Sequence, residues 1–354
     1  MSDYLGNAYP GLAGQLRKVS FASLPTPISH HQVQVSAKNC LIAVKHDDQT
    51  SPIYGGNKIR KLEYVIQRAR ERGAKRVATF GAVGSNHALA TALFAREFGF
   101  ECTAFLAHQK YTPNIPKTLG VHLELGTELV RYGGSVDRLA LLRRYLQNRK
   151  TWVIPLGGSC WLGVIGFVNA GLELAAQIDS GELQLPDRIY MANGTMGSVA
   201  GLALGLALAN MNPEIHAVRV ADNRFAKREV LDRLMKKTAT LLNRFEPDIP
   251  VDLTDTTNIT WRDEFYAGGY AVVDERTQHA VEFARDNLGL DLDTTYTGKA
   301  MAALLYDLES SKANRTSLFW NTYNSRPLPN VNLTNLSLQE LPEDFKRYFE
   351  RQSV

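Results

Sequence analysis

Val77-Ala78-Thr79-Phe80-Gly81-Ala82-Val83-Gly84-Ser85-Asn86 is the stretch of sequence that decides the fold. Its first four residues are apolar or β-branched and predict a buried strand, and the glycine- and serine-containing run that follows predicts a tight turn into a helix. The helical pattern continues through Phe98, and a new apolar strand is predicted at residues 102–106. A strand, a helix and a second strand in this order are typical of a parallel sheet covered by helices.

The same alternation extends outward in both directions. Apolar residues at helical spacing predict a helix over 61–72 that ends at Gly73, and residues 40–45 predict a short buried strand. Further strands are predicted at 153–155, 188–192 and 215–220, and further helices at 163–178, 199–209, 275–287 and 299–310. The tail after Arg326 has little periodicity and is predicted to run over the surface. The fold class is therefore α/β, with mainly parallel sheets covered by helices.

Composition narrows the class of protein. A chain of 354 residues exceeds one simple domain and favours two lobes. Hydrophobic residues make up 44% and charged residues 21%, which excludes disordered and fibrous classes. The net charge of +4 arises from 40 basic and 36 acidic residues that are scattered along the chain. We therefore expect no nucleic-acid partner.

Cysteine use and hydropathy bear on location. Cys40, Cys102 and Cys160 lie far apart without the spacing of metal ligands, so neither a disulfide framework nor a metal site is expected. The N-terminus lacks a basic region followed by an apolar stretch, and no run of 18 apolar residues occurs. These features predict a cytoplasmic protein without a membrane partner.

A lysine follows two glycines in the run Gly55-Gly56-Asn57-Lys58, just before the helix predicted over 61–72. Glycine allows the backbone a tight approach. Lys61 and the helix N-terminus both place positive charge nearby, which lowers the pKa of a lysine amine. Lys58 is therefore a candidate nucleophile toward an aldehyde carbon. The alternative is an ordinary surface lysine at the start of a helix.

Two turns combine glycine with polar side chains between a strand and a helix. The turn from Gly81 to His87 suits a carboxylate or phosphate, because backbone amides at a helix start attract anions. The turn from Asn193 to Ser198 is typical of a cradle for one phosphate. Helix capping alone is the alternative for both. Only part of a G-x-G-x-x-G fingerprint is present in the second turn, which disfavours a nicotinamide-dependent dehydrogenase.

Two tyrosines complete the set of candidate residues. Tyr270 follows two glycines, and Tyr296 precedes Thr297-Gly298-Lys299 at a predicted helix start. Phenol groups can flank a flat ring or shuttle protons, and half-buried packing is the alternative. A lysine, a one-phosphate cradle, an anion turn and aromatic hydroxyls are together what pyridoxal 5'-phosphate requires.

These runs, in this order, resemble the family of D-cysteine desulfhydrase and 1-aminocyclopropane-1-carboxylate deaminase. The carrying segments are Pro25-Thr26-Pro27, 55–58 with 60–63, 85–87, 154–155 with 157–159, 194–201 and 296–299. The resemblance implies the two-lobe, tryptophan-synthase-β-like fold of pyridoxal-phosphate enzymes, known as fold type II. It implies a large domain of residues 1–60 and 169–354, a small inserted domain of residues 61–168, a cofactor between them, and a homodimer.

The resemblance also implies roles for single residues. Lys58 matches the lysine that holds the cofactor as a Schiff base, and Asn86 matches the partner of the phenolic oxygen of the cofactor ring. Thr322 lies where the family places the group near the ring nitrogen. The implied phosphate site consists of Lys61 with Gly194, Thr195, Met196, Gly197 and Ser198. The implied substrate carboxylate site consists of Ser85, Asn86 and His87. The implied catalytic group consists of Lys58, Tyr296, Tyr270 and Ser85.

Thr297 distinguishes between the activities of this family. Deaminases carry glutamate after the second tyrosine and desulfhydrases carry threonine. The resemblance therefore implies α,β-elimination on a small D-amino acid such as D-cysteine, giving pyruvate, ammonia and sulfide. The alternatives are a deaminase of the cyclopropane acid or a related amino acid, and a cofactor carrier with little turnover.

Three runs depart from the family pattern at positions that shape the substrate pocket. Residues 320–324, Trp-Asn-Thr-Tyr-Asn, replace the usual His-Thr-Gly-Gly. Cys160-Trp161 follows Ser159 where smaller residues are common, and Val83-Gly84 replaces Ile-Gln. These departures bear on which substrate the pocket accepts.

Overall fold

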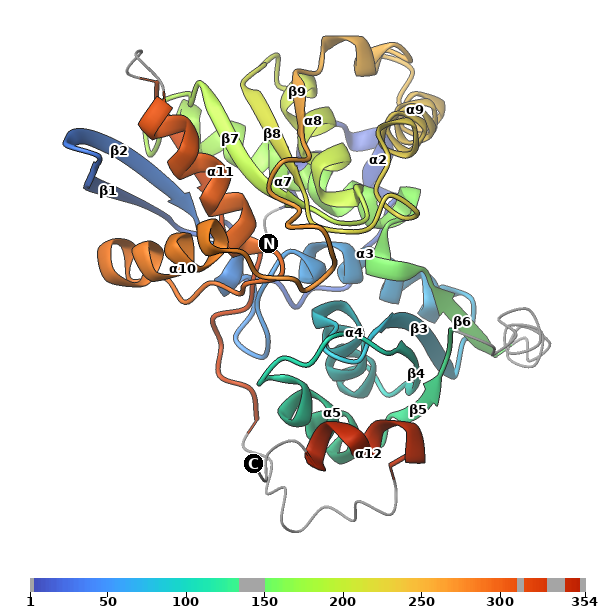
Figure 1. The fold of residues 1–354 in the computed structure, drawn as a ribbon. Coiled ribbons are helices and arrows are strands. Elements are labelled where there is room, and N and C mark those ends of the chain that lie inside the picture. The colour runs from blue at the N-terminus through green and yellow to red at the C-terminus, as the bar shows by residue number, and fades with distance from the viewer. Residues whose placement is uncertain (1–2, 134–149, 311–314, 330–340, 351–354) are drawn as a thin grey trace. The chain divides into compact units, whose positions relative to one another are not determined.

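The structure is a computed structural model that describes residues 3–133, 150–310, 315–329 and 341–350. Contacts divide the chain into two compact units. Unit 1 comprises Met1–Tyr64 and Ser159–Arg326, and unit 2 comprises Val65–Gly158 and Pro327–Val354. Each unit has its own sheet with helices packed against it (Figure 1). The α/β class with mainly parallel sheets is confirmed.

The sheet of unit 1 has six strands in the order β1-β2-β10-β7-β8-β9. These are β1 (Ile28–Val35), β2 (Lys38–Lys45), β7 (Arg188–Asn193), β8 (Glu214–Arg219), β9 (Ile259–Arg262) and β10 (Ser317–Trp320). Only β1 and β2 pair antiparallel, as a hairpin, and all other neighbours are parallel. The carboxyl ends of the parallel strands therefore meet at one edge, which is where ligands of such sheets bind.

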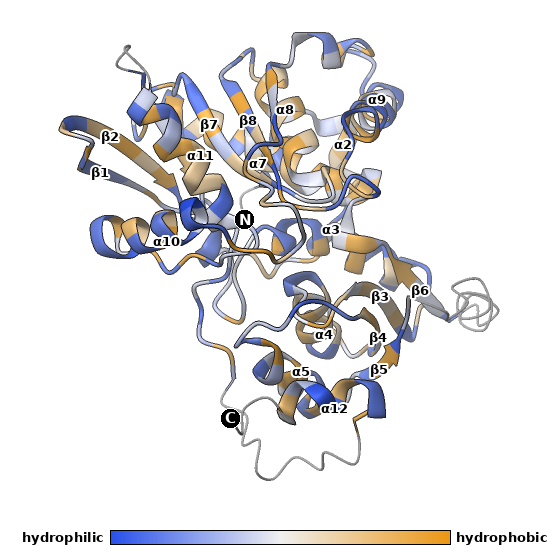
Figure 2. Cartoon of the chain, viewed as in Figure 1, coloured by the Kyte–Doolittle hydropathy of each residue, from blue (hydrophilic) through white to orange (hydrophobic). Residues whose placement is uncertain are grey.

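The helices of unit 1 include two apolar ones that pack closely together. Their bounds are α1 (Tyr4–Ala8), α2 (Pro10–Ala13), α3 (Lys58–Glu71, which continues into unit 2), α7 (Trp161–Asp179), α8 (Gly197–Leu208), α9 (Arg228–Phe245), α10 (Glu275–Leu288) and α11 (Thr297–Ser310). A Cβ added at Gly205 of α8 would lie 2.2 Å from the carbonyl oxygen of Val168 in α7, so the approach requires glycine. Figure 2 shows α8 in predominantly hydrophobic colours, as a core helix requires.

Helix α7 is long and apolar enough to cross a membrane by length and composition alone. However, 78% of its apolar window is buried inside the protein, and its main neighbour is α8. It is therefore packed as a core helix of unit 1, and its composition is weak evidence for a membrane span.

The sheet of unit 2 has four parallel strands in the order β5-β4-β3-β6. The strands are β3 (Arg76–Ala82), β4 (Glu101–Ala107), β5 (Glu128–Arg131) and β6 (Thr151–Ile154), and the helices are α4 (Asn86–Glu97), α5 (Ile115–Glu124) and α12 (Glu343–Glu350). The predicted strand–helix–strand run is confirmed as β3, α4 and β4.

The C-terminal tail differs from the prediction. It contains α12, whose Phe345 and Tyr348 are buried in a cluster with Val83, Ile115 and Leu341. These contacts group the tail with unit 2, whereas the implied domain bounds placed it in the large domain. The helix was not predicted, although Phe345, Tyr348 and Phe349 are spaced as one face, because it is short and the tail around it contains three prolines and little periodicity.

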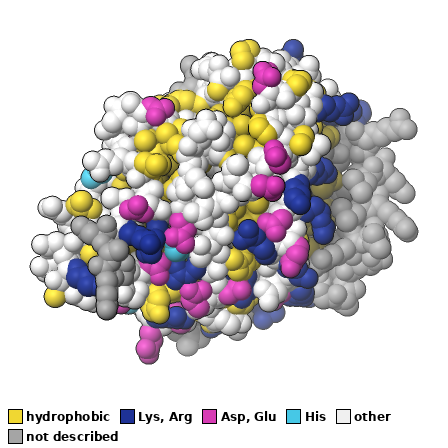
Figure 3. Space-filling model, turned by 90° about the horizontal axis from the view of Figure 1, so that it is seen from above, with side chains coloured by type: hydrophobic (Ala, Val, Ile, Leu, Met, Phe, Trp, Pro, Cys, Tyr) yellow, Lys and Arg dark blue, Asp and Glu magenta, His cyan; other side chains and the backbone are white. Residues whose placement is uncertain are grey.

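Charged side chains of both signs are interspersed on the face shown in Figure 3. This mixing follows from their scattering along the sequence. Among the residues that the structure describes, no three His, Cys, Asp or Glu side chains group as metal ligands.

Candidate active site

Lys58 is the first residue of α3 and is half-buried. Its Nζ donates a hydrogen bond of 2.7 Å to Oδ1 of Asn57. Burial lowers the pKa of the Lys58 amine to about 8, and the carboxylate of Asp293 partly offsets this effect. The main cause of the lowered pKa is therefore desolvation, rather than the neighbouring charge that the sequence suggested. An amine with such a pKa is partly neutral near pH 8 and nucleophilic.

The turn before Lys58 is held by close backbone contacts. Gly56 has a φ of +97°, and a Cβ added there would lie 2.9 Å from the carbonyl oxygen of Thr322. That oxygen accepts a 3.1 Å hydrogen bond from the backbone N–H of Asn57, and Asn324 Oδ1 accepts one of 2.6 Å from Gly55 N–H. Thus residues of the unusual run 320–324 pack against the turn before Lys58 and accept hydrogen bonds from its backbone.

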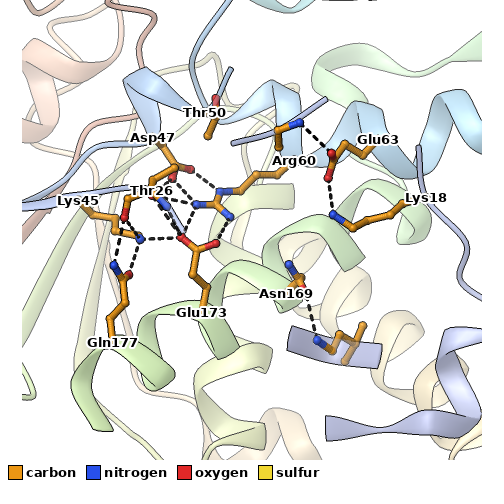
Figure 4. Close-up of polar contacts among 12 residues, drawn as sticks. Lys18, Thr26, Lys45, Asp47, Thr50, Arg60, Glu63, Asn169, Glu173 and Gln177 are labelled. Atoms are coloured by element: carbon orange, nitrogen blue, oxygen red, sulfur yellow. Dashed lines mark hydrogen bonds and ion pairs between the residues drawn. The ribbon is translucent and has the colours of Figure 1, made fainter. Parts of the chain in front are cut away.

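A buried network of charges fixes the first turns of α3 (Figure 4). Arg60 donates to Asp47 at 2.7 Å and to Glu173 at 2.8 Å, and Glu173 also accepts from Lys45 at 2.6 Å. All four side chains are fully buried or nearly so. Burial alone would raise the pKa of Glu173, but Arg60 and Lys45 lower it to about 2. Because Arg60 lies two residues after Lys58, this network holds the lysine in place.

The N-terminus of α8 forms an anion cradle. Met196, with a φ of 62°, precedes the helix, and no side chain caps it. The first N–H groups of a helix have no acceptor within the helix and attract anions. A Cβ added at Gly197 would lie 2.6 Å from Ser159 Oγ and 3.0 Å from Lys61 Nζ. The hydroxyls of Ser159 and Thr195 share a hydrogen bond of 2.7 Å. Hydroxyls, an ammonium and helix N–H groups therefore converge here.

Lys61 supplies the amine of this cradle, and an anion bound beside it would favour its charged form. Its Nζ donates to Ser159 Oγ at 3.3 Å, and burial, followed by the charge of Lys58, holds its pKa well below the ordinary value. A buried ammonium is stabilised by an adjacent anion. Asn57 Nδ2 donates to Ser198 Oγ at 2.9 Å, which joins the lysine turn to the cradle. The residues present therefore fit a group that carries one phosphate and reacts with Lys58.

Asn193 lies at the end of β7, directly before the cradle. Its side chain is buried, and both of its amide atoms lack a hydrogen-bond partner among the described residues. Buried polar groups normally have partners, so this amide is available to a bound ligand.

The two predicted tyrosines meet in unit 1. The hydroxyls of Tyr270 and Tyr296 share a short hydrogen bond, and their rings lie edge to face with centroids 6.0 Å apart. Burial, with a further contribution from Tyr270, holds the pKa of Tyr296 well above its ordinary value. Tyr296 therefore stays protonated and can donate a proton. A Cβ added at Gly194 would lie 4.0 Å from the ring of Tyr296, so the pair is next to the phosphate loop.

Asp293 is a residue of this site that the sequence did not single out. Its Oδ1 accepts from the backbone N–H and the hydroxyl of Thr297, at 3.0 and 2.7 Å, and its Oδ2 accepts from the N–H of Tyr296 at 2.8 Å. Burial raises its pKa despite these bonds. Asp293 thereby orients both Tyr296 and Thr297 and interacts with Lys58. A capping pattern before α11 could have identified the aspartate, but not its proximity to Lys58.

Lys299 holds the segment that carries Tyr270. Its fully buried Nζ donates to the carbonyl oxygens of Tyr266 and Gly269 at 2.7 and 3.3 Å. Burial lowers the pKa of Lys299 to about 8, although Asp274 and Asp293 act in the opposite direction. The segment is strained, since its alanines at 267 and 271 have φ values of 59° and 57°.

The structure groups the predicted residues in two sets. Unit 1 contains Lys58, Lys61, Thr322, both tyrosines and the loop 194–198, and unit 2 contains Ser85, Asn86 and His87. Thr322 is largely buried, and its backbone oxygen binds the lysine turn.

Within unit 2, the anion turn begins α4. Ser85 caps the helix, because its Oγ accepts from the N–H of Ala88 at 3.3 Å. Asn86 is half-buried at the first helical position. The His87 side chain is only 3% exposed and pairs with the hydroxyl of Thr79 at 3.0 Å. His87 therefore points into unit 2, and the group it offers to a ligand at this turn is its backbone N–H.

Comparisons with known proteins show what the whole chain is similar to. The model of the family described as "Pyridoxal-phosphate dependent enzyme" matches residues 19–322. The chain is 33% identical over 301 residues to a D-cysteine desulfhydrase of Klebsiella pneumoniae (strain 342), covering 81% of this chain and 87% of that protein. The crystal structure of an ACC deaminase homologue matches with a TM-score of 0.73 and 27% identity, over 89% of this chain and 94% of the other. A fungal L-serine ammonia-lyase from Rhizomucor miehei matches with a TM-score of 0.59 and 18% identity, over 93% of this chain and 99% of the other, and this shows the fold alone.

Proposed function

The chain belongs to the family of pyridoxal-phosphate dependent enzymes, and from this premise we propose that it catalyses α,β-elimination on a small D-amino acid such as D-cysteine. The products would be pyruvate, ammonia and sulfide. A lyase or deaminase that uses pyridoxal phosphate is what the matched relatives share. The choice of D-cysteine as the substrate is the part that we propose for this chain.

When bound, pyridoxal phosphate supplies an electron sink for negative charge at the substrate Cα. Lys61, Thr195 and Ser198 would hold its phosphate, Lys58 would bind its aldehyde carbon, and Thr322 would lie near its ring nitrogen. Asn86 would meet its phenolic oxygen. The Nζ of Lys58 would take the proton from the substrate Cα, for which a pKa of about 8 is suitable.

The tyrosine pair would act on the leaving group. Loss of the β-substituent is aided by a proton donor at sulfur, since neutral hydrogen sulfide leaves more readily than the hydrosulfide anion. Tyr296 keeps its proton because of burial, and the Tyr270 hydroxyl is its hydrogen-bond partner. We propose that this pair protonates the departing sulfur, while Ser85, Asn86 and the N–H groups of α4 receive the substrate carboxylate.

The observation that carries the choice of reaction is the environment of Thr297. This side chain is fully buried, and its hydroxyl donates to Asp293 at 2.7 Å. A glutamate here would bring a second carboxylate against Asp293, whose pKa is already raised by burial. The local chemistry thus supports threonine and elimination, and not the glutamate associated with ring-opening deaminases.

Product analysis separates the candidate functions. Purified protein loaded with the cofactor is incubated separately with D-cysteine, L-cysteine and 1-aminocyclopropane-1-carboxylate. We expect sulfide and pyruvate from D-cysteine. 2-Oxobutyrate from the cyclopropane acid, without sulfide, would favour the deaminase, and no product from any compound would favour the carrier. The 27% identical ACC deaminase homologue keeps the deaminase as the second candidate.

Two substitutions test the role of Thr297. Thr297→Glu should abolish sulfide release while the visible absorbance of the bound cofactor persists. Thr297→Ser keeps the hydroxyl that binds Asp293 and should retain most activity. Unchanged turnover in Thr297→Glu would contradict the role given to this position.

We further propose a cytoplasmic homodimer with neither membrane nor nucleic acid as partner. The dimer is supported by the family resemblance. The reducing compartment is supported by free cysteines, since Cys40 and Cys102 are buried and unpaired. Sedimentation of the purified protein would test the dimer.

A further inference from the structure

The anion turn of unit 2 is braced by a glutamine from the segment after β4. Gln109 Oε1 accepts a 3.1 Å hydrogen bond from the backbone N–H of Gly84. A Cβ added at Gly84 would lie 3.1 Å from Gln109 Nε2 and 3.3 Å from its Oε1. The carboxamide of Gln109 therefore fills the space that a side chain at residue 84 would need, and it fixes the Val83–Gly84 peptide, two residues before the start of α4.

Gln109 is in turn fixed by the C-terminal helix. The Tyr348 hydroxyl accepts from the backbone N–H of Gln109 at 3.2 Å and lies 3.1 Å from its carbonyl oxygen, to which it donates. The same hydroxyl is 3.1 Å from Nδ1 of His108. Tyr348 is thus the anchor of the short segment that carries Gln109.

Apolar packing supports the same connection. Tyr348 and Phe345 of α12 are 3% and 0% exposed, and they belong to one cluster with Val83 and Ile115. Val83 immediately precedes Gly84, so α12 reaches the anion turn by packing as well as by hydrogen bonds. This helix lies beyond residues 19–322, the part of the chain that the family model matches.

We propose that Gln109, held by Tyr348, is a positioning residue for the turn Gly84–His87, and that α12 thereby sets the affinity for the substrate carboxylate. The inference rests on the proposed function of this turn. Ser85 caps α4 through its side chain, and Gly84 joins Ser85 to the Val83–Gly84 peptide that Gln109 holds, so the orientation of this peptide affects where the first N–H groups of α4 point.

The test compares four variants of the full-length, cofactor-loaded protein. Gln109→Met and Tyr348→Phe each remove hydrogen bonds while keeping packing volume. Each should raise the KM for D-cysteine about fivefold, the equivalent of one hydrogen bond, with kcat within about twofold. Gln109→Glu keeps the acceptor for Gly84 but adds negative charge beside an anion site, and should raise KM at least as much. Gln278→Met, at an exposed position of α10, is the matched control.

A second measurement does not depend on turnover. Amide hydrogen exchange in residues 81–89 should become faster in Gln109→Met and in Tyr348→Phe, because the opening of the turn becomes easier. If the wild-type protein releases sulfide and both variants match it in KM and in exchange, the inference is overturned and the proposed function stands. If Gln109→Glu leaves KM unchanged, Gln109 does not act on the carboxylate. If the wild-type protein has no turnover, the proposed function fails, and faster exchange still supports the hold of Gln109 on the turn.

Discussion

The hydroxyls of Tyr270 and Tyr296 are hydrogen-bonded to each other, with their rings inclined by 74°. Tyr296 comes from the start of α11, where Asp293 holds its backbone N–H. Tyr270 comes from a strained segment of the same unit. A shared hydrogen bond allows one phenol to donate a proton outward while the other replaces it. The two residues therefore form one functional unit rather than two independent contacts.

Removing the donor of this pair should reduce chemistry more than binding. We expect Tyr296→Phe to lower kcat for sulfide release by about 100-fold, the lower end of general-acid effects, with a smaller change in KM. The double variant with Tyr270→Phe should lose little more than Tyr296→Phe alone, because both act through one hydrogen bond. Tyr306→Phe, an exposed tyrosine of α11, is the control and should behave as the wild type. Additive losses in the double variant would argue for two separate roles.

The pH dependence of cofactor capture should report the pKa of Lys58. Only the neutral amine attacks an aldehyde, and with a pKa of about 8 its neutral fraction rises with pH through that value. Between pH 7 and pH 9 the rate at which the apo-protein gains visible absorbance from added pyridoxal phosphate should rise about tenfold and then level off. Lys58→Ala should show no capture.

A substitution at Asp293 should shift the pH midpoint of cofactor capture in a defined direction. The Asp293 carboxylate raises the pKa of Lys58, so Asp293→Asn should move the midpoint of capture to lower pH. Asparagine keeps one acceptor oxygen for the N–H groups at the start of α11 and loses the other, so part of the cap remains while the charge is removed. A midpoint near that of an ordinary lysine in the wild type, or a shift to higher pH in Asp293→Asn, would contradict the structural account.

Local patterns predicted the elements of the parallel sheets, and they did so where apolar periodicity is strong. The strands at 77–80 and 188–192 and the helix at 163–178 appear as β3, β7 and α7. Helix α9 was not predicted, although Leu231, Met235 and Leu242 are spaced as one buried face. Helix α3 begins at Lys58, three residues before the predicted start, because its first turn is fixed by Asp47 and Glu173 and not by its own periodicity.

Only part of the candidate site could be predicted from the sequence, because some of its contacts join residues that are far apart along the chain. Lys58, the loop 194–198 and Tyr296 stand at strand or helix ends with glycine or hydroxyl neighbours, and such local signals are visible in a sequence. The proximity of Asp293 to Lys58 and the contact of Gln109 with Gly84 join residues that no local pattern connects. Contacts of this kind depend on how strands are ordered in each sheet.

Breaking the buried charge network should be costly. Glu173→Gln leaves Lys45 and Arg60 with less compensating charge in the interior, and we expect a loss of about 3–5 kcal/mol in the free energy of unfolding. The pKa of Glu173 in the folded state, about 2, lies below its ordinary value. This contribution is therefore complete above the ordinary pKa and is lost as the pH falls through about 2. Urea titration at neutral pH measures the loss.

An exposed ion pair provides the matched control for this measurement. Glu101 pairs with Arg76 in unit 2, and its side chain is 68% exposed. Glu101→Gln should cost less than about 1 kcal/mol, because water screens the pair. Equal effects of Glu173→Gln and Glu101→Gln would show that the buried network does not stabilise the fold.

Lys299 fixes the segment that carries Tyr270, so removing its ammonium should lower kcat. Lys299→Met removes the hydrogen bonds to the carbonyl oxygens of Tyr266 and Gly269, which are worth about 1.5–3 kcal/mol when the donor is charged. The strained backbone at Ala271 would then relax and move Tyr270 away from Tyr296. We expect kcat for sulfide release to fall about tenfold or more, with the absorbance of the bound cofactor unchanged.

A rescue and a control decide whether Lys299 acts through this segment. Ala271→Gly removes the strain of a left-handed alanine, so in the Lys299→Met background it should restore part of the lost kcat. Lys38→Met removes another lysine that donates to a backbone carbonyl, that of Glu309, but on the exposed surface, and it should leave kcat unchanged. If Ala271→Gly restores nothing while Lys299→Met is inactive, Lys299 acts on the site by a different route from the position of Tyr270.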